Sequence, residues 1–289
     1  MTSSPPPEPQ AQRSLLRKRL LPLIRIPILV YIGLLSLMLL FENRLVYRPT
    51  PSGENSGHTP EDKIRDLFFH SPDGTRLHAW YFESKTPKAH VLYLHGNAGN
   101  LRGRKRDLMY LRKRQQISIL ALDYRGYGKS QGSPHEKGLL EDARTARKIL
   151  AQEAGIKEQD VILYGRSLGG GIAVQLASRD GARGLILQST FSSLPDVSAH
   201  LYPWFPVRML MRNRFDSLSV IDRYPGPLLQ SHGTEDEVIP YRFGKRLHQK
   251  ARSPKWWVDF PGTGHNEPTP KLFDAPIEKF LNFLSTNGS

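Results

Sequence analysis

The chain has 289 residues, which suits one full-sized α/β domain plus an appendage, and its hydrophobic fraction of 38% is enough for a domain core. It contains no cysteine, which excludes disulfide bonds, thiolate metal sites and a cysteine nucleophile. The formal net charge is +14, yet the body of the chain has no long basic tract, zinc-finger signature or RNA-binding signature. We therefore expect an anionic membrane surface, rather than nucleic acid, as a partner; a charge without a specific partner is the alternative.

The N-terminal region is predicted to hold a disordered leader and then a membrane segment. Residues 1–19 are first rich in Pro, Ser and Gln and then basic, which is typical of disorder. Residues 20–41 are apolar except for Arg25 and a few small or interfacial residues, and such a stretch matches a bilayer core of about 30 Å. Arg25 lies near the N-terminal end of the stretch, where its side chain reaches the headgroups.

The apolar stretch is interpreted as a signal anchor that stays in the membrane. A cleaved signal peptide is one alternative, although no small-residue cleavage site follows Leu40, and a soluble core helix is another. Four basic residues precede the stretch and Arg25 lies near its start, so five come before its uninterrupted apolar part at 26–41, whereas only Arg44 and Arg48 follow shortly after it. The positive-inside rule therefore predicts a cytoplasmic N-terminus and a large domain on the non-cytoplasmic side.

A linker is predicted at 42–63, and strand and helix patterns alternate in a predicted domain at 64–285. The first two strands flank a Pro-Asp-Gly turn, which indicates a hairpin. The alternation predicts the α/β class, with a mostly parallel central sheet and helices on both faces. Strands are expected at 66–70, 76–82, 90–94, 117–122, 161–164, 184–187, 227–230 and 256–260, and helices ending near 114 and at 138–154, 168–179, 242–252 and 271–285.

Ser167 stands at the centre of a Gly-x-Ser-x-Gly pattern that runs from Gly165 to Gly169, between a short apolar strand and a helix-compatible run. A serine at such a sharp turn exposes its hydroxyl at the carboxyl edge of the sheet. The glycines let strand and helix pass closely, and the helix N-terminus offers N–H groups to a developing oxyanion. Ser167 is the predicted nucleophile; the alternative is a glycine-rich turn with a structural serine.

A serine nucleophile needs a base, and the base needs an orienting acid, in the chain order serine, acid, histidine. Asp236 follows a predicted strand in an acidic loop, with Glu235 and Glu237 as competing acids. His265 lies in a glycine-rich loop between the last predicted strand and the last predicted helix. We predict Asp236 and His265 as acid and base; an acidic turn and a solvated loop histidine are the alternatives.

The backbone N–H groups of Asn97 and Leu168 are expected to form an oxyanion hole. Asn97 lies in the loop His-Gly-Asn-Ala-Gly-Asn after the strand predicted at 90–94. A phosphate-cradling loop is the rival interpretation, but the pattern Gly-x-x-x-x-Gly-Lys-Ser/Thr is absent. His95 is expected to brace the loop rather than to take part in chemistry. No metal or organic cofactor is expected.

With these motifs in place, residues 64–285 resemble the α/β-hydrolase superfamily and, more narrowly, its membrane-anchored abhydrolase-domain lipases and protein depalmitoylases. The resemblance implies the α/β-hydrolase fold, and it implies that residues 124–128 form a loop near the pocket entrance. The matching pieces are His-Gly-Asn-Ala-Gly-Asn from His95, Asp-Tyr-Arg-Gly-Tyr-Gly-Lys-Ser from Asp123, Gly-Arg-Ser-Leu-Gly-Gly from Gly165, His-Gly-Thr-Glu-Asp from His232 and Gly-His ending at His265.

The resemblance also implies a small cap at 191–221. This segment is aromatic and apolar and has basic neighbours. An apolar cap beside a membrane anchor favours acyl chains presented from the bilayer, and packing of these residues onto the core is the alternative.

The sequence therefore predicts a serine hydrolase of the carboxylesterase, lipase or thioesterase type. It would cleave carboxylic ester or thioester bonds of acyl or lipid-like substrates through an acyl-enzyme on Ser167. His265 would carry the proton, and Asp236 would fix the tautomer of His265. The alternatives are a serine peptidase or amidase on the same residues, and a non-catalytic membrane-tethered binding protein on a hydrolase fold.

Overall fold

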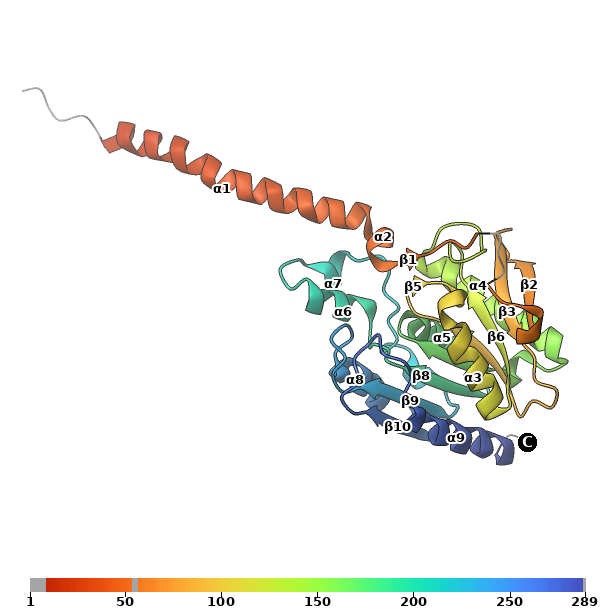
Figure 1. Ribbon diagram of the computed structural model, residues 1–289. Coiled ribbons are helices and arrows are strands. Elements are labelled where there is room, and N and C mark those ends of the chain that lie inside the picture. The colour runs from red at the N-terminus through yellow and green to blue at the C-terminus, as the bar shows by residue number, and fades with distance from the viewer. Residues whose placement is uncertain (1–8, 54–56, 288–289) are drawn as a thin grey trace, which may run out of the picture. The chain divides into compact units, whose positions relative to one another are not determined.

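The computed structural model describes residues 9–53 and 57–287, with side chains from residue 23 onward in these ranges (Figure 1). The chain forms two compact units, one ending at Leu45 and the other beginning at Val46. Residues 1–8 of the predicted leader lie outside the described residues. The second unit carries every residue that the sequence assigns to chemistry.

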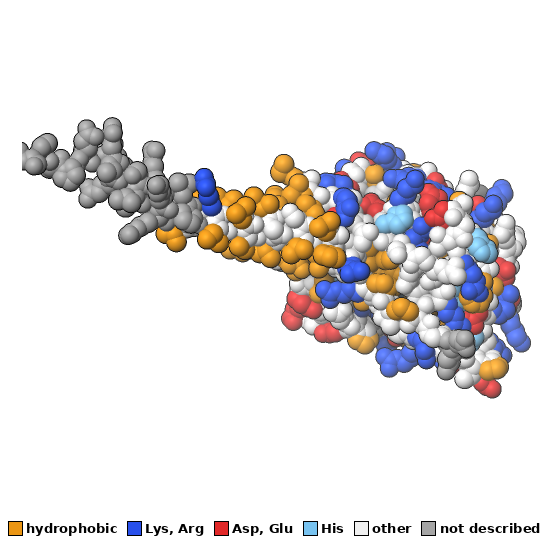
Figure 2. Space-filling view, turned by 90° about the horizontal axis from the view of Figure 1, so that it is seen from above, with side chains coloured by type: hydrophobic (Ala, Val, Ile, Leu, Met, Phe, Trp, Pro, Cys, Tyr) orange, Lys and Arg blue, Asp and Glu red, His pale blue; other side chains and the backbone are white. Residues whose placement is uncertain are grey.

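The first unit contains helix α1, Pro9–Leu40, after which α2, Glu42–Val46, leads into the second unit. Helix α1 begins inside the segment predicted to be disordered, because Pro is tolerated in a first turn and the Gln, Ala, Leu, Arg and Lys residues that follow favour helix. The window Leu23–Leu40 has a mean hydropathy of 2.3 and is not buried. Hydrophobic side chains cover the described part of α1 on the face seen in Figure 2. By length and composition this helix can cross a membrane, and a signal sequence has the same properties.

The second unit is built on an eight-stranded sheet of order β10-β9-β8-β7-β4-β6-β3-β2. Strand β3 is antiparallel to both neighbours, and the other neighbouring strands pair in parallel. The predicted hairpin is present as β2 and β3, and the predicted mostly parallel sheet is confirmed. The strands are β2 Ile64–His70, β3 Arg76–Phe82, β4 His90–Leu94, β6 Ser118–Asp123, β7 Ile162–Arg166, β8 Gly184–Gln188, β9 Leu228–Gly233 and β10 Lys255–Phe260.

Helices cover both faces of this sheet, as predicted (Figure 1). Helices α3, Lys105–Gln115, and α9, Asp274–Thr286, pack on one face, where their apolar side chains join those of the strands in one core cluster. The other face carries a second core cluster. Its helices are α4 Glu136–Ala154, α5 Leu168–Asp180 and α8 Tyr241–Lys250.

The segment expected to form a cap contains two short helices, α6 Leu194–Leu201 and α7 Val207–Leu210. Val197 is buried in the core, whereas Trp204 is 85% exposed and Met209 is 84% exposed. Each of the two expectations for this segment therefore describes part of it: some apolar side chains pack onto the core and others reach solvent.

The segment predicted to be a linker is structured where it meets the second unit. Strand β1, Arg48–Pro49, pairs in parallel with β5, Ala98–Gly99. The side chain of Tyr47 is 2% exposed, and its hydroxyl donates a hydrogen bond of 2.7 Å to Asn213 Oδ1. The composition of this segment predicts a linker, but one buried aromatic ring and a few backbone hydrogen bonds hold it on the domain. The compact unit therefore begins at Val46 rather than at residue 64.

Replacing Tyr47 tests whether this segment belongs to the folded domain. Tyr47→Ala is expected to lower the free energy of unfolding by about 3–5 kcal/mol, as for other large buried aromatic side chains. Tyr47→Phe removes the hydroxyl alone and is expected to cost about 1 kcal/mol. Urea unfolding of the full chain in detergent, followed by circular dichroism, measures both values. An unchanged unfolding midpoint for Tyr47→Ala would show that the segment does not contribute to the domain.

Candidate active site

Ser167 occupies the turn between strand β7 and helix α5, at the carboxyl edge of the sheet. Its backbone has φ 53° and ψ −119°, in a region that residues other than glycine rarely adopt. Such a conformation costs about 1–3 kcal/mol and persists only where the surrounding structure holds it in place. Ser167 is 8% exposed, so this strained turn presents its hydroxyl within a largely enclosed site.

Two glycines allow this turn to form. A Cβ on Gly165 would lie 2.4 Å from the carbonyl oxygen of Gly169, and a Cβ on Gly169 would lie 2.0 Å from the carbonyl oxygen of Leu94. Neither backbone oxygen can move aside as a flexible side chain could. The glycines of the Gly-x-Ser-x-Gly pattern are therefore required by the contact of strand and helix, as the sequence analysis expects.

The structure brings Ser167, His265 and Asp236 together in the predicted order. The Ser167 hydroxyl lies 3.0 Å from His265 Nε2, to which it donates, and His265 Nδ1 donates to Asp236 Oδ2 at 2.7 Å. Both distances lie within the range for a nucleophile–base pair and its orienting acid. The competing acids, Glu235 and Glu237, are exposed. Of the three acidic residues in the loop, only Asp236 faces the histidine.

Asp236 is held in its ionised form by its surroundings. Burial by itself raises the pKa of a carboxyl group, but hydrogen bonds from His232 and His265 and the charge of His265 hold the pKa of Asp236 well below its usual range. Its other oxygen accepts the backbone N–H groups of Val238, at 3.0 Å, and Ile239, at 2.7 Å. These contacts fix the carboxylate that orients His265.

His232 also belongs to this site, although the pattern of the sequence does not predict a role for it. His232 is fully buried in strand β9, and its Nε2 lies 2.9 Å from the Ile239 carbonyl oxygen and 3.2 Å from Asp236 Oδ2. The Nε2–H group of His232 therefore faces both oxygens and helps to hold the acidic loop in place. The chain offers one signal for it, since His232 lies four residues before Asp236 on the strand that leads into the loop.

The predicted oxyanion loop lies directly beside Ser167. A Cβ on Gly96 would lie 3.4 Å from Ser167 Cβ. The next residue is Asn97, whose backbone N–H makes no hydrogen bond within the part of the chain that the structure describes. Leu168 is the first residue of α5, so its N–H has no acceptor within the helix. Among the described residues, neither predicted donor uses its backbone N–H in a hydrogen bond outside the helix ladders.

Two tyrosines from the loop expected near the pocket entrance brace the predicted oxyanion loop. Tyr124 and Tyr127 are completely buried. Their hydroxyls donate to the carbonyl oxygens of His95, at 3.0 Å, and Asn97, at 2.8 Å. The apolar rings are buried and each hydroxyl finds a backbone acceptor, as is usual for tyrosine in a core.

His95 packs against these tyrosines and has the bracing position that the sequence suggested. Its ring centroid lies 4.5 Å from that of Tyr124, and its Nδ1 lies 2.7 Å from the carbonyl oxygen of Gly96, to which it donates. Burial lowers the pKa of His95 to about 4, so the ring is neutral near pH 7.

Arg166, next to Ser167, holds the loop that carries His265. Its Nη2 donates to the carbonyl oxygen of His265 at 3.2 Å and to that of Glu267 at 2.8 Å. Arg166 occupies a variable position of the Gly-x-Ser-x-Gly pattern, so the pattern predicts no role for it. In the structure it ties the nucleophile turn to the histidine loop.

Comparisons with known proteins agree with the α/β-hydrolase fold of the second unit. Residues 85–224 match a family model described as serine aminopeptidase, S33. An uncharacterized protein of Mycobacterium tuberculosis is 35% identical over 266 residues, which cover 91% of this chain and 94% of that protein. The alpha/beta hydrolase domain-containing protein WAV2 of Arabidopsis thaliana is 30% identical over 257 residues, covering 80% and 83%. A solved esterase of Pyrococcus furiosus superposes with a TM-score of 0.66 at 17% identity, covering 83% of this chain and 98% of the esterase, which is a likeness of fold.

The lowered pKa of Asp236 predicts how stability depends on pH. The unfolded chain takes up a proton near the ordinary aspartate pKa of about 3.9, whereas the folded chain resists it to lower pH. The contribution of Asp236 to stability is therefore complete above about pH 4 and is lost as the pH falls toward its folded pKa. Asp236→Asn is expected to flatten the loss of unfolding free energy as the pH falls from about 4 to about 2, measured by urea unfolding. Glu235→Gln, at an exposed neighbour, should keep the wild-type slope, and parallel curves for wild type and Asp236→Asn would contradict the prediction.

Proposed function

This chain belongs to the α/β-hydrolase family, and on that premise we propose that it is a serine hydrolase that cleaves carboxylic ester or thioester bonds through an acyl-enzyme on Ser167. One observation carries the proposal: the unbroken hydrogen-bonded series from the Ser167 hydroxyl through both ring nitrogens of His265 to the buried carboxylate of Asp236. This is the arrangement by which a base activates a serine at neutral pH.

The geometry supports a reaction in two halves. Ser167 Oγ attacks the carbonyl carbon while His265 Nε2 accepts the hydroxyl proton, and the N–H groups of Asn97 and Leu168 donate to the oxyanion. The intermediate collapses, and the departing alcohol or thiol takes the proton from His265. Water then attacks the acyl-enzyme with His265 again as base, and the carboxylic acid leaves. Asp236 stays ionised throughout and holds the imidazole in the productive tautomer.

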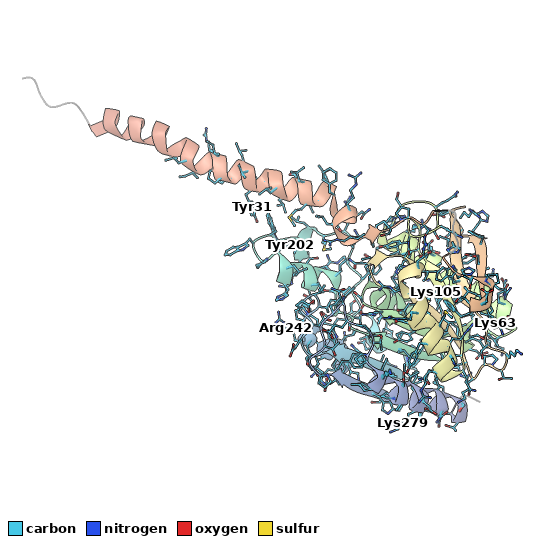
Figure 3. All side chains as sticks on the ribbon, viewed as in Figure 1. Tyr31, Lys63, Lys105, Tyr202, Arg242 and Lys279 are labelled. Atoms are coloured by element: carbon cyan, nitrogen blue, oxygen red, sulfur yellow. The ribbon has the colours of Figure 1, made fainter. Side chains whose placement is uncertain are left out.

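Acyl or lipid-like substrates fit the surface of the cap at 191–221. Trp204 and Met209 project from it and are 85% and 84% exposed, and Arg208 beside them has 63% of its side chain exposed. Tyr202, at the end of α6, also reaches the surface of the cap (Figure 3). Exposed apolar side chains with a basic neighbour are suited to an interface with lipid.

We also propose that residues 20–41 anchor the protein in a membrane, with the N-terminus cytoplasmic and the hydrolase domain on the other side. The support is the exposed apolar window Leu23–Leu40 and the excess of basic residues before it. In this proposal the membrane, including its anionic lipid, is the partner for the basic surface, and nucleic acid is not.

A serine peptidase or amidase is the second candidate, because the matched family model is described as a serine aminopeptidase. The same three residues and the same oxyanion donors cleave amides. The two candidates differ in the leaving group that the substrate loses when the acyl-enzyme forms. Substrates that share one acyl group and carry either a phenolate or an anilide leaving group therefore distinguish an esterase from an amidase.

Ser167→Ala tests the mechanism. Purified wild-type protein is expected to bind a fluorescent fluorophosphonate covalently and to hydrolyse p-nitrophenyl acyl esters faster than the matching p-nitroanilides. Ser167→Ala should lose the label and lower ester turnover by about 10³-fold or more, since the hydroxyl forms the covalent intermediate. Ser285→Ala, at an exposed serine of α9, is the matched control and should label as wild type does. Equal labelling of Ser167→Ala and wild type would refute the mechanism.

Two measurements test the membrane anchor: alkaline extraction of membranes that contain the protein, and the intact mass of the protein. Membranes that contain the full chain are expected to retain it after washing at alkaline pH, and the intact mass of the protein should include residues 20–41. Protease added to the cytoplasmic side should remove the leader and spare the hydrolase domain. A protein that lacks residues 20–41 in its mature form would identify the apolar stretch as a cleaved signal peptide.

A further inference from the structure

A pocket of about 240 Å³ opens on the face of the sheet that carries α3 and α9, away from the hydroxyl of Ser167. Its volume is just below the range of about 300–1,000 Å³ that is usual for ligand pockets, so a ligand for it would be small. The walls come from the ends of β4 and β7, from α3 and α9, and from the loop between His265 and α9. Ser167, Asp236 and His265 do not line it.

The floor of the pocket is apolar and aromatic. Tyr93 and Tyr164 meet edge to face with ring centroids 5.3 Å apart, and both are less than one-tenth exposed. Leu108 of α3 and Ile277 of α9 close the sides and are almost fully buried. Such a floor favours an acyl or aryl group over a sugar or a phosphate.

The rim of the pocket is basic, and part of its charge is not neutralised. Arg106 lies 3.8 Å from Asp107, and Asp274 accepts from Tyr110 and lies 3.7 Å from Arg114, so both acids are paired. In residues 57–287, by contrast, Arg166 and Lys271 form no ion pair, although both line the pocket. A guanidinium and an ammonium group without a carboxylate partner, above an aromatic floor, match a ligand with an apolar body and one negative charge.

We propose that this pocket binds a small amphipathic carboxylate, with its acyl or aryl body on Tyr93 and Tyr164 and its carboxylate at Arg166 and Lys271. The source of the ligand rests on the proposed function, since ester or thioester hydrolysis releases an acid of this class. The site itself rests on the pocket and its charges.

The walls of the pocket also hold the loop that carries His265. Arg166 donates to the carbonyl oxygens of His265 and Glu267, and Thr269 exchanges hydrogen bonds with Gln188. Gln188 in turn accepts from the hydroxyl of Tyr164 at 2.8 Å. A carboxylate at Arg166 would therefore contact the group that positions the catalytic loop, so product in this pocket is placed to affect turnover.

The test is calorimetric titration of full-length Ser167→Ala in nanodiscs with hexanoate and, as the uncharged counterpart, 1-hexanol, each corrected by empty nanodiscs. Hexanoate is expected to bind at one site, and at least tenfold more tightly than hexanol. Ile277→Trp, which fills the pocket, should abolish hexanoate binding. Lys271→Glu, at an exposed position, should weaken binding about tenfold. Lys279→Gln, on the outer side of α9 (Figure 3), is the control and should bind as the parent does.

Two results would overturn the proposal: no hexanoate binding to the folded parent, or binding that neither Ile277→Trp nor Lys271→Glu weakens. The Lys271 variant decides the matter if Ile277→Trp does not fold. Because Ser167→Ala cannot form an acyl-enzyme, these measurements do not depend on catalysis. A failure of fluorophosphonate labelling would refute the proposed function and leave this site standing.

Discussion

The close contact between strand β7 and helix α5 is the constraint on which the site depends. Ser167 can stand at φ 53° only because Gly165 and Gly169 let the backbones approach to distances that exclude a Cβ. The strain of about 1–3 kcal/mol in this turn is held by apolar packing, since α5 is buried from Leu168 to Ala177. The core of the domain thus fixes the direction of one hydroxyl, and the loops that carry Asp236 and His265 need only reach it.

The oxyanion loop is supported from two sides. Buried tyrosine hydroxyls bind its carbonyl groups from beneath, and strand β1 pairs with β5 alongside it. The Arg48 N–H donates to the carbonyl oxygen of Asn97 at 3.0 Å, and Asn97 Nδ2 donates to that of Val46 at 3.0 Å. The carbonyl and side-chain groups of Asn97 are thus bound within the fold, which leaves its backbone N–H for the proposed oxyanion contact. Val46 and Arg48, which follow the apolar N-terminal helix in the chain, thus also hold the predicted oxyanion loop in place.

The sequence predicts the parts of the site that depend on local order along the chain. Ser167, Asp236 and His265 each follow a strand of a parallel sheet, and the carboxyl ends of such strands meet at one edge. The contacts that it does not predict join segments far apart in the chain. Arg166 reaches the carbonyl of Glu267, and Tyr47 reaches Asn213, through side chains whose partners depend on the finished packing. The sequence alone does not show which acid, Asp236 or Glu235, contacts His265, because this depends on the direction in which each side chain of the loop points.

A series of hydrogen bonds between polar side chains connects strands β2, β3 and β6 to the same loop. Asp123, at the end of β6, accepts the N–H of Leu101 at 3.0 Å, just after the oxyanion loop, and lies 3.1 Å from His78 Nδ1. The other ring nitrogen of His78 lies 2.6 Å from Asp66, and hydrogen bonds from His78 and His58 outweigh burial and lower the pKa of Asp66. Removing one of these side chains would leave a buried charge unpaired. The resulting loss of unfolding free energy is larger than the net stabilisation that the intact series provides. The predicted oxyanion loop is therefore anchored at both ends, by tyrosines at its start and by this series at its end. If the loop holds the oxyanion as proposed, such a rigid donor set needs no rearrangement when charge develops on the substrate.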